Sequence, residues 1–167
     1  MKKTFALALA LMLATAGFAQ KFGFCNSTVL LSELAEVKAA DSDLKDFQSQ
    51  LTKRGQEMVK ALQEKAAELE RKKELGTISQ NDYATQATKL GEEEEKIKAY
   101  EQEVYTKLGE KRKILFDPIL EKVNTAMKAV AEENKFTYVF DSSTQVILYA
   151  DESLDVTKLV KAKLGVN

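Results

Sequence analysis

The middle of the chain carries apolar and small residues at a spacing that places them all on one side of a long helix. Between residues 41 and 75 the steps from one such residue to the next are 3, 4, 4, 3, 4, 4 and 3, a pattern that repeats every eleven residues. These positions are Leu44, Phe47, Leu51, Gly55, Met58, Leu62, Ala66 and Leu69. An eleven-residue repeat favours a nearly straight packing seam. The pattern predicts a helix of about 35 residues, about 50 Å long.

A short break of four residues, Gly76 to Ser79, follows this helix. Gly76 suits the left-handed position that ends a helix. Ser79 suits an N-cap, and Asp82 stands three residues later, where a capping-box acid would lie. Two long periodic segments joined by so short a connection predict an antiparallel helical hairpin.

The second helix of this hairpin is expected to follow a heptad. One seam position recurs every seven residues, at Tyr83, Leu90, Ile97 and Val104. The complementary seam positions are Ala87, Glu94, Glu101, Leu108 and Leu115. Because two of these are glutamates, we expect the hairpin to be held weakly along its middle.

Strand-forming residues lie near the two ends of the chain. They occupy residues 21–25, 136–140 and 146–150, and a turn signal at 141–144 predicts that the last two segments form a β-hairpin. Short helices are expected after Asn26 or Ser27 and after the capping residue Asp155. The fold class is therefore mainly α with a small β part. A helical-hairpin arm, residues 41–115, is inserted in an α+β body of residues 20–40 and 116–167, and Pro118 marks where the second body segment begins.

The body is small for an independent core. It would contain about 73 residues and three short strands, a size at which single domains are marginally stable. Short open strands also leave unpaired edges. Association of identical chains would address both problems, so we expect a homo-oligomer.

The first nineteen residues have the pattern of a secretory signal peptide. Lys2 and Lys3 precede an apolar run from Phe5 to Ala14, and small residues at 17 and 19 predict cleavage after Ala19. The apolar run is about half the roughly 20 residues that span a bilayer, and no spanning run follows. We expect an exported protein that is not embedded in a membrane.

Several chemistries have no support in the sequence. The chain contains no histidine, no glycine-rich phosphate loop and only one cysteine, Cys25. Removing the leader takes away two of 25 basic residues and none of 26 acidic ones, which leaves 23 − 26 = −3. An acidic chain is a poor ligand for nucleic acid. Catalytic, cofactor and metal sites are not expected. Asp117, Asp141 and Asp151 could supply carboxylates, but no spacing pairs them with a pocket.

The two ends of the mature chain carry a resemblance. The opening KFGFCNSTVLLSELAEVKAAD and the closing FTYVFDSSTQVILYADESLDVTKLVKAKL, with its Asp155-Val156-Thr157 helix start, flank a charged helical hairpin. In these features the chain resembles the OmpH-like (Skp) family of periplasmic outer-membrane protein chaperones. The resemblance implies a homotrimer whose arms surround a cavity. Unfolded outer-membrane proteins would be held there without ATP, on their way across the periplasm.

Client-binding residues are expected on the outer half of the arm, at Met58, Leu62, Leu69, Leu75, Ile78 and Tyr83. For Leu62, Leu69 and Tyr83, periodicity favours a place in the hairpin seam. Ile78 lies in the turn without an obvious packing partner. The alternative function is a structural coiled-coil spacer or tether of the envelope without chaperone activity. An enzyme is the third alternative, with the least support.

Overall fold

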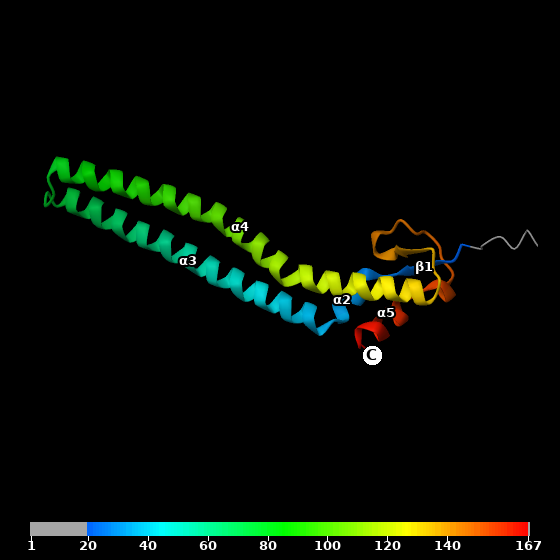
Figure 1. Cartoon of the computed structure of the whole chain (residues 1–167). Helices are drawn as coiled ribbons and strands as arrows, with labels where there is room; N and C mark the ends of the chain where they lie inside the picture. Colours follow the sequence, from blue (N-terminus) through cyan, green and yellow to red (C-terminus); the bar gives the residue numbers. More distant parts are fainter. Residues whose placement is uncertain (1–19, 167) are drawn as a thin grey trace, which may run out of the picture. The chain divides into compact units, whose positions relative to one another are not determined.

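The computed structural model describes residues 20–166, and two long helices dominate it (Figure 1). The predicted fold class, mainly α with a small β part, is confirmed. The predicted signal peptide lies outside the described residues. In chain order the elements are β1 (Phe22–Cys25), α2 (Ser27–Glu33), α3 (Ala35–Glu74), α4 (Gln80–Glu133), β2 (Tyr138–Asp141), η1 (Ser142–Thr144), η2 (Glu152–Leu154) and α5 (Thr157–Leu164).

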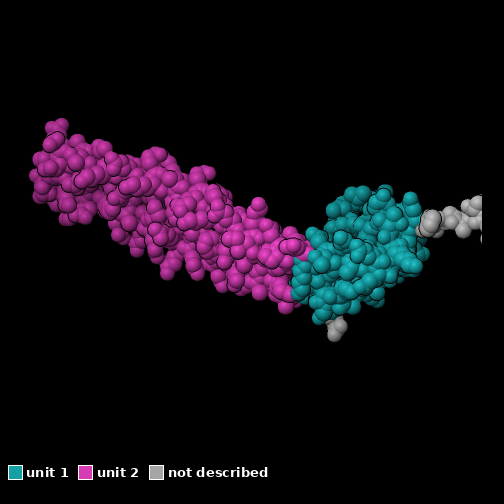
Figure 2. All heavy atoms as spheres, viewed as in Figure 1, with its two compact units in different colours: residues 1–34, 122–167 teal, residues 35–121 magenta. Residues whose placement is uncertain are grey.

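The chain divides into two compact units, coloured separately in Figure 2. Among the described residues, 35–121 form the hairpin unit, and 20–34 together with 122–166 form the body unit. The expected limits were residues 40 and 116, and the assignment of separate roles to arm and body stays a prediction. In the described part of the chain, no helix is long and apolar enough to cross a membrane.

The predicted helical hairpin is confirmed, and its turn is built as expected. Gly76 has a φ of +64°, and the amide of Thr77 donates to the carbonyl of Lys72 at 2.9 Å, which closes the end of α3. Ser79 Oγ accepts a 3.1 Å hydrogen bond from the amide of Asp82 and so caps α4. Pro118 lies inside α4 without ending the helix.

The seam of the hairpin follows the predicted face of α3 and, at all but two positions, that of α4. Every predicted seam position on α3 is buried or half-buried. On α4, Glu94 and Glu101 are exposed, and the residues one position earlier, Glu93 and Tyr100, face inward. The prediction of two glutamates in the seam was wrong. A seven-residue repeat gradually falls out of register with an eleven-residue repeat on the facing helix. On α4 the inward-facing positions therefore advance by three residues, from Leu90 to Glu93 and from Ile97 to Tyr100, which restores the register.

The body unit contains a parallel pair of strands. Phe22 stands opposite Tyr138 and Phe24 opposite Phe140, so β2 pairs with β1. The predicted β-hairpin of 136–140 with 146–150 was wrong, because residues 146–150 form no strand. The chain leaves β2 through η1 and then Gln145, whose φ of 57° is left-handed, and this path does not return alongside β2.

The core of the body unit is formed by side chains in or next to β1, α2 and α5. Its most completely buried side chains are Cys25, Leu30, Leu34, Val156 and Val160. The amide of Val156 donates to the carbonyl of Phe24 at 2.9 Å, which ties the start of α5 to β1. As predicted, the carboxylate of Asp155 caps that helix by accepting a 2.8 Å hydrogen bond from the amide of Thr157.

Candidate functional site

The tip of the hairpin exposes apolar side chains. Leu75, the last residue before Gly76, is 63% exposed, and Ile78 in the turn is half-buried. Both positions were expected as client contacts, and the local reason for their exposure is the tight turn, which gives them no facing helix. They are the two expected residues that lie beyond the helix ends.

Polar contacts join the two helices close to this tip. The Tyr83 hydroxyl donates to the carboxylate of Glu70, and Lys73 Nζ donates to the same hydroxyl at 3.4 Å. Lys73 Nζ also stands 4.6 Å from the centroid of the Tyr83 ring. The hydrogen bond from Tyr83 lowers the pKa of Glu70, and the Tyr83 contact raises the pKa of Lys73. Tyr83 therefore serves as a link between the helices.

The other three expected residues lie along the packing seam of α3. Leu69 is buried, and Met58 and Leu62 are half-buried. Beside them, Lys65 Nζ bridges to Glu93 Oε1 at 2.6 Å, so the seam near the tip combines apolar packing with an ion pair between helices. The structure places the six expected residues on one outer segment of the hairpin but does not gather them into a single pocket.

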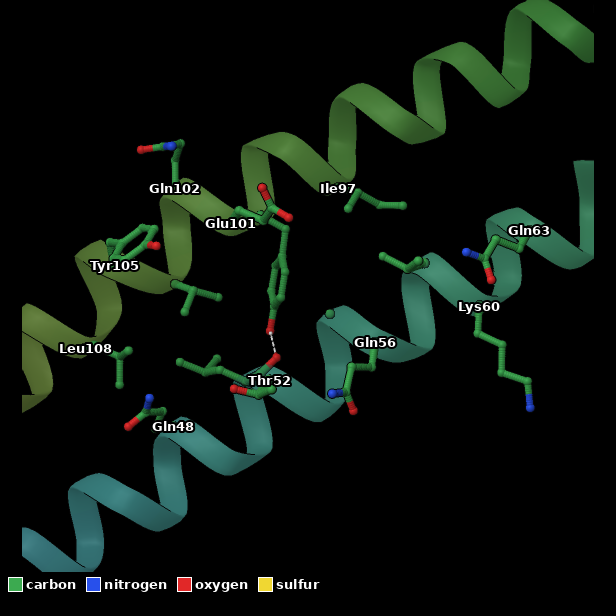
Figure 3. Close-up of a pocket in the computed structure, with 15 residues that line it drawn as sticks. Gln48, Thr52, Gln56, Lys60, Gln63, Ile97, Glu101, Gln102, Tyr105 and Leu108 are labelled. Carbon is green, nitrogen blue, oxygen red and sulfur yellow. Dashed lines mark hydrogen bonds between the residues drawn. The ribbon is translucent and has the colours of Figure 1, made fainter.

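A groove opens in the middle of the hairpin. It was not predicted from the sequence. It has a volume of about 730 Å³ and is lined by α3 between Gln48 and Gln63 and by α4 between Ile97 and Leu108. We call it the hairpin groove (Figure 3). Only Lys60 and Glu101 of its fifteen lining residues are charged.

Tyr100 forms the floor of the hairpin groove. Its side chain is 8% exposed, and its hydroxyl donates a 3.1 Å hydrogen bond to the carbonyl of Leu51, the dashed line in Figure 3. The ring lies close to Gly55, where an added Cβ would stand 3.5 Å from Tyr100 Cε1. A side chain larger than hydrogen at position 55 would narrow this space. The only sequence signal for the groove was this glycine in an otherwise apolar seam.

The rim of the hairpin groove offers apolar surface to solvent. Tyr105 is 72% exposed and Val59 is 39% exposed. The lining also includes Gln48, Gln56 and Gln102, which carry side-chain amides. Exposed apolar side chains beside a hollow are typical of a contact surface.

The body unit carries a second apolar surface. The rings of Phe22, Tyr138 and Phe140 lie with centroids 6.0 to 6.2 Å apart on the exposed face of the strand pair. The following segment, residues 146–150, leaves Leu148 96% exposed and Tyr149 88% exposed. Strand-forming side chains are thus displayed without a partner strand among residues 20–166.

Carboxylates and the cysteine have local structural roles. Asp141 accepts hydrogen bonds from Ser27 and Ser143, and Asp151 accepts one from the amide of Ser153. Burial raises the pKa of the Cys25 thiol, which keeps it protonated. Within residues 20–166 there is no group of three or more metal-binding side chains that could hold an ion.

Comparison with known proteins identifies the family. The sequence profile of the family described as outer membrane protein (OmpH-like) matches residues 21–164. A search of curated proteins found no match. A solved structure from Caulobacter crescentus, a candidate outer membrane chaperone (OmpH-like), aligns with a TM-score of 0.75 over 87% of this chain and 83% of that chain. At 21% identity this likeness establishes the fold. Because the profile spans nearly the whole described chain, the protein belongs to the OmpH-like outer membrane protein family.

Proposed function

We propose that the protein is an ATP-independent holdase chaperone of the periplasm. It would bind unfolded outer-membrane proteins and prevent their aggregation on the way to the outer membrane. The observation that carries this proposal is the family match over residues 21–164. The proposal includes export, with cleavage after Ala19.

The chemistry of the hairpin supports weak and multiple contacts with a client. Its exposed apolar side chains, such as Leu75 and Tyr105, are separated from one another by charged residues. Holding an unfolded chain restricts its conformational entropy, and many weak contacts offset that cost while still allowing release. We propose that Met58, Leu62, Leu69, Leu75, Ile78 and Tyr83 contribute to client binding. Exposure favours Leu75, while Leu69 would need the seam to open.

The body unit supports self-association. The exposed Phe22, Tyr138 and Phe140 rings and the segment 146–150 together present apolar and strand-forming surface. Residues 146–150 could pair with a strand edge of another copy. We propose a homotrimer in which these surfaces are covered by neighbouring copies.

Light scattering on a urea-unfolded outer-membrane barrel protein tests the holdase proposal. Diluting the barrel protein into buffer with the mature chaperone should give a clear solution and a discrete soluble complex, whereas the barrel protein alone should precipitate. Bovine serum albumin at equal mass concentration controls for non-specific effects. Precipitation that is equally fast with and without the mature protein would contradict the proposal and favour the structural spacer.

A further inference from the structure

The hairpin groove is nearly free of charge, although charged residues make up 31% of the chain. The two charged lining residues, Lys60 and Glu101, have opposite signs, so the lining is neutral overall. The remaining lining residues are apolar or carry uncharged polar groups. The lining therefore attracts neither a positive nor a negative ligand over a neutral one, and moving a charge from water onto its apolar floor costs free energy. A ligand that fits the groove is therefore uncharged along the part that enters it.

The uncharged polar groups around the groove are available for new hydrogen bonds. Within residues 20–166, the side-chain amides of Gln48, Gln56, Gln63 and Gln102 make no hydrogen bond to another protein group. Each amide carries two N–H donors and a carbonyl acceptor. The backbone of an extended polypeptide carries one N–H donor and one carbonyl acceptor per residue. The glutamine amides can therefore pair with a backbone that has no partner strand.

The floor and the rim of the groove suit the alternate side chains of such an extended chain. Successive side chains of a strand point to opposite faces. One set would meet Tyr100, which is held in place by its hydrogen bond to Leu51, together with Tyr105 and Val59 at the rim. The other set would face water. A volume of about 730 Å³ accommodates a few side chains.

We propose that the hairpin groove binds one extended, uncharged polypeptide segment in which apolar and polar residues alternate. This is the side-chain pattern of a barrel strand of an outer-membrane protein, which runs for about ten residues between turns. The inference deepens the holdase proposal and rests on it for the source of the segment. It assigns neutral strands, rather than charged loops or termini, as the part of the client that the groove holds.

Peptide binding to the mature protein tests this assignment. The probe is a fluorescein-labelled ten-residue peptide in which valine and tyrosine alternate with threonine and asparagine. Matched peptides replace two of the polar residues with lysine or with glutamate. Fluorescence anisotropy should show that the neutral peptide binds wild-type protein at least about tenfold more tightly than either charged peptide. Equal binding of all three peptides would overturn the proposal.

Two matched variants locate the binding site. Tyr105→Glu places a charge at the rim of the groove, and Ile114→Glu makes a comparable change at a residue that is 69% exposed on the same helix outside the groove lining. Circular dichroism should confirm equal helix content. Tyr105→Glu should weaken neutral-peptide binding about tenfold, and Ile114→Glu should leave it unchanged. Equal loss in both variants, or loss in neither, would overturn the assignment of the groove.

The peptide assay and the barrel-aggregation assay together distinguish a failure of the groove proposal from a failure of the holdase proposal. Wild-type protein that binds the neutral peptide through Tyr105 but lets the unfolded barrel protein precipitate would overturn the holdase proposal and retain the groove. Protein that keeps the barrel soluble while Tyr105→Glu binds the peptide as tightly as wild type would overturn the groove and retain the holdase.

Discussion

The hydroxyl of Tyr100 on α4 donates a 3.1 Å hydrogen bond to the backbone carbonyl of Leu51 on α3. This bond crosses the seam at the point where Gly55 leaves room for the ring. It joins the two helices by a buried polar contact, and the hydrogen bonds from Lys65 to Glu93 and from Tyr83 to Glu70 join them again nearer the tip. A buried hydrogen bond thus contributes to the middle of the hairpin, where two glutamates had been predicted in the seam.

Replacing Tyr100 with phenylalanine tests this contact. The change keeps the ring and removes the buried hydroxyl, so we expect a loss of about 1 kcal/mol in the free energy of unfolding. Urea unfolding followed by circular dichroism measures it. Tyr105→Phe removes a hydroxyl from a ring that is 72% exposed and serves as the matched control, with no expected change. Equal effects of the two substitutions would show that the Leu51 hydrogen bond contributes nothing specific.

The packing face of α3 could be predicted because its seam is almost purely apolar and its steps match the helical period. Most of the α4 seam could also be predicted, but the inward positions of Glu93 and Tyr100 could not, because Tyr100 carries a hydroxyl and the heptad through Glu94 and Glu101 is as regular as the true seam. Only the facing helix decides between the two. The hairpin groove depends on the same register, so it could not be predicted from the sequence alone either.

The strand pairing illustrates the same limit. Residues 146–150 have strong strand propensity, and the turn signal before them is real, since Asp141 accepts a hydrogen bond from the amide of Ser143. Propensity describes how well a residue suits a strand and not which segment it will pair with. The turn leads into a left-handed Gln145, and β2 pairs instead with β1, more than a hundred residues earlier.

Replacing glycines in the interior of α4 with alanine should stabilise the protein. Gly91 and Gly109 have no neighbouring atom within 4 Å of an added Cβ. Alanine at either position should raise the free energy of unfolding by roughly 1 kcal/mol, because glycine is the poorer helix former. The unfolding midpoint in urea is the measurement. Gly76→Ala provides the opposite case: its φ of +64° costs an alanine about 1 kcal/mol, so stability should fall. A fall in stability for Gly91→Ala would contradict the prediction.

Asp141 should make the stability of the body unit dependent on acid pH. Burial alone would raise the pKa of this carboxyl, but hydrogen bonds from Ser27 and Ser143 outweigh burial and lower the pKa to about 2 from an ordinary 3.8. Ser27 Oγ donates to Asp141 Oδ2 at 2.6 Å. Because the pKa in the folded state is depressed, the contribution is complete above about pH 4. It is lost as pH falls from about 4 to 2.

Urea unfolding of wild type and Asp141→Asn between pH 5 and pH 2 measures this contribution. The variant should be less stable at pH 5, and the difference between the two proteins should shrink as the wild-type carboxylate becomes protonated. Asp117→Asn removes one negative charge at an exposed position of α4 and controls for the change in net charge, so at pH 5 it should change stability less than Asp141→Asn does. A difference for Asp141→Asn that did not change with pH would rule out the titration of this carboxyl as its cause.

Client retention should depend on the tip of the hairpin. Leu75 is 63% exposed and Ile78 is half-buried in the turn, so Leu75→Ser and Ile78→Ser should change unfolding by urea little. Each should shorten the time for which an unfolded barrel protein stays soluble, measured by light scattering. Ile114→Ser removes a similarly exposed side chain far from the turn and should have the smaller effect. Equal retention by wild type and both tip variants would remove the tip from the contact surface.

Assembly should depend on the segment that the single chain leaves unpaired. Leu148 and Tyr149 are almost fully exposed, and a charge on a strand edge opposes pairing with another strand. The double variant Leu148→Asp/Tyr149→Asp should therefore lower the mass in solution, measured by multi-angle light scattering, from three copies toward one. The same charges at Val59 and Ile114, exposed positions on the hairpin, should leave three copies together. An unchanged mass for the Leu148→Asp/Tyr149→Asp protein would place the subunit contacts elsewhere in the body unit, with the aromatic surface of Phe22, Tyr138 and Phe140 as the next region to alter.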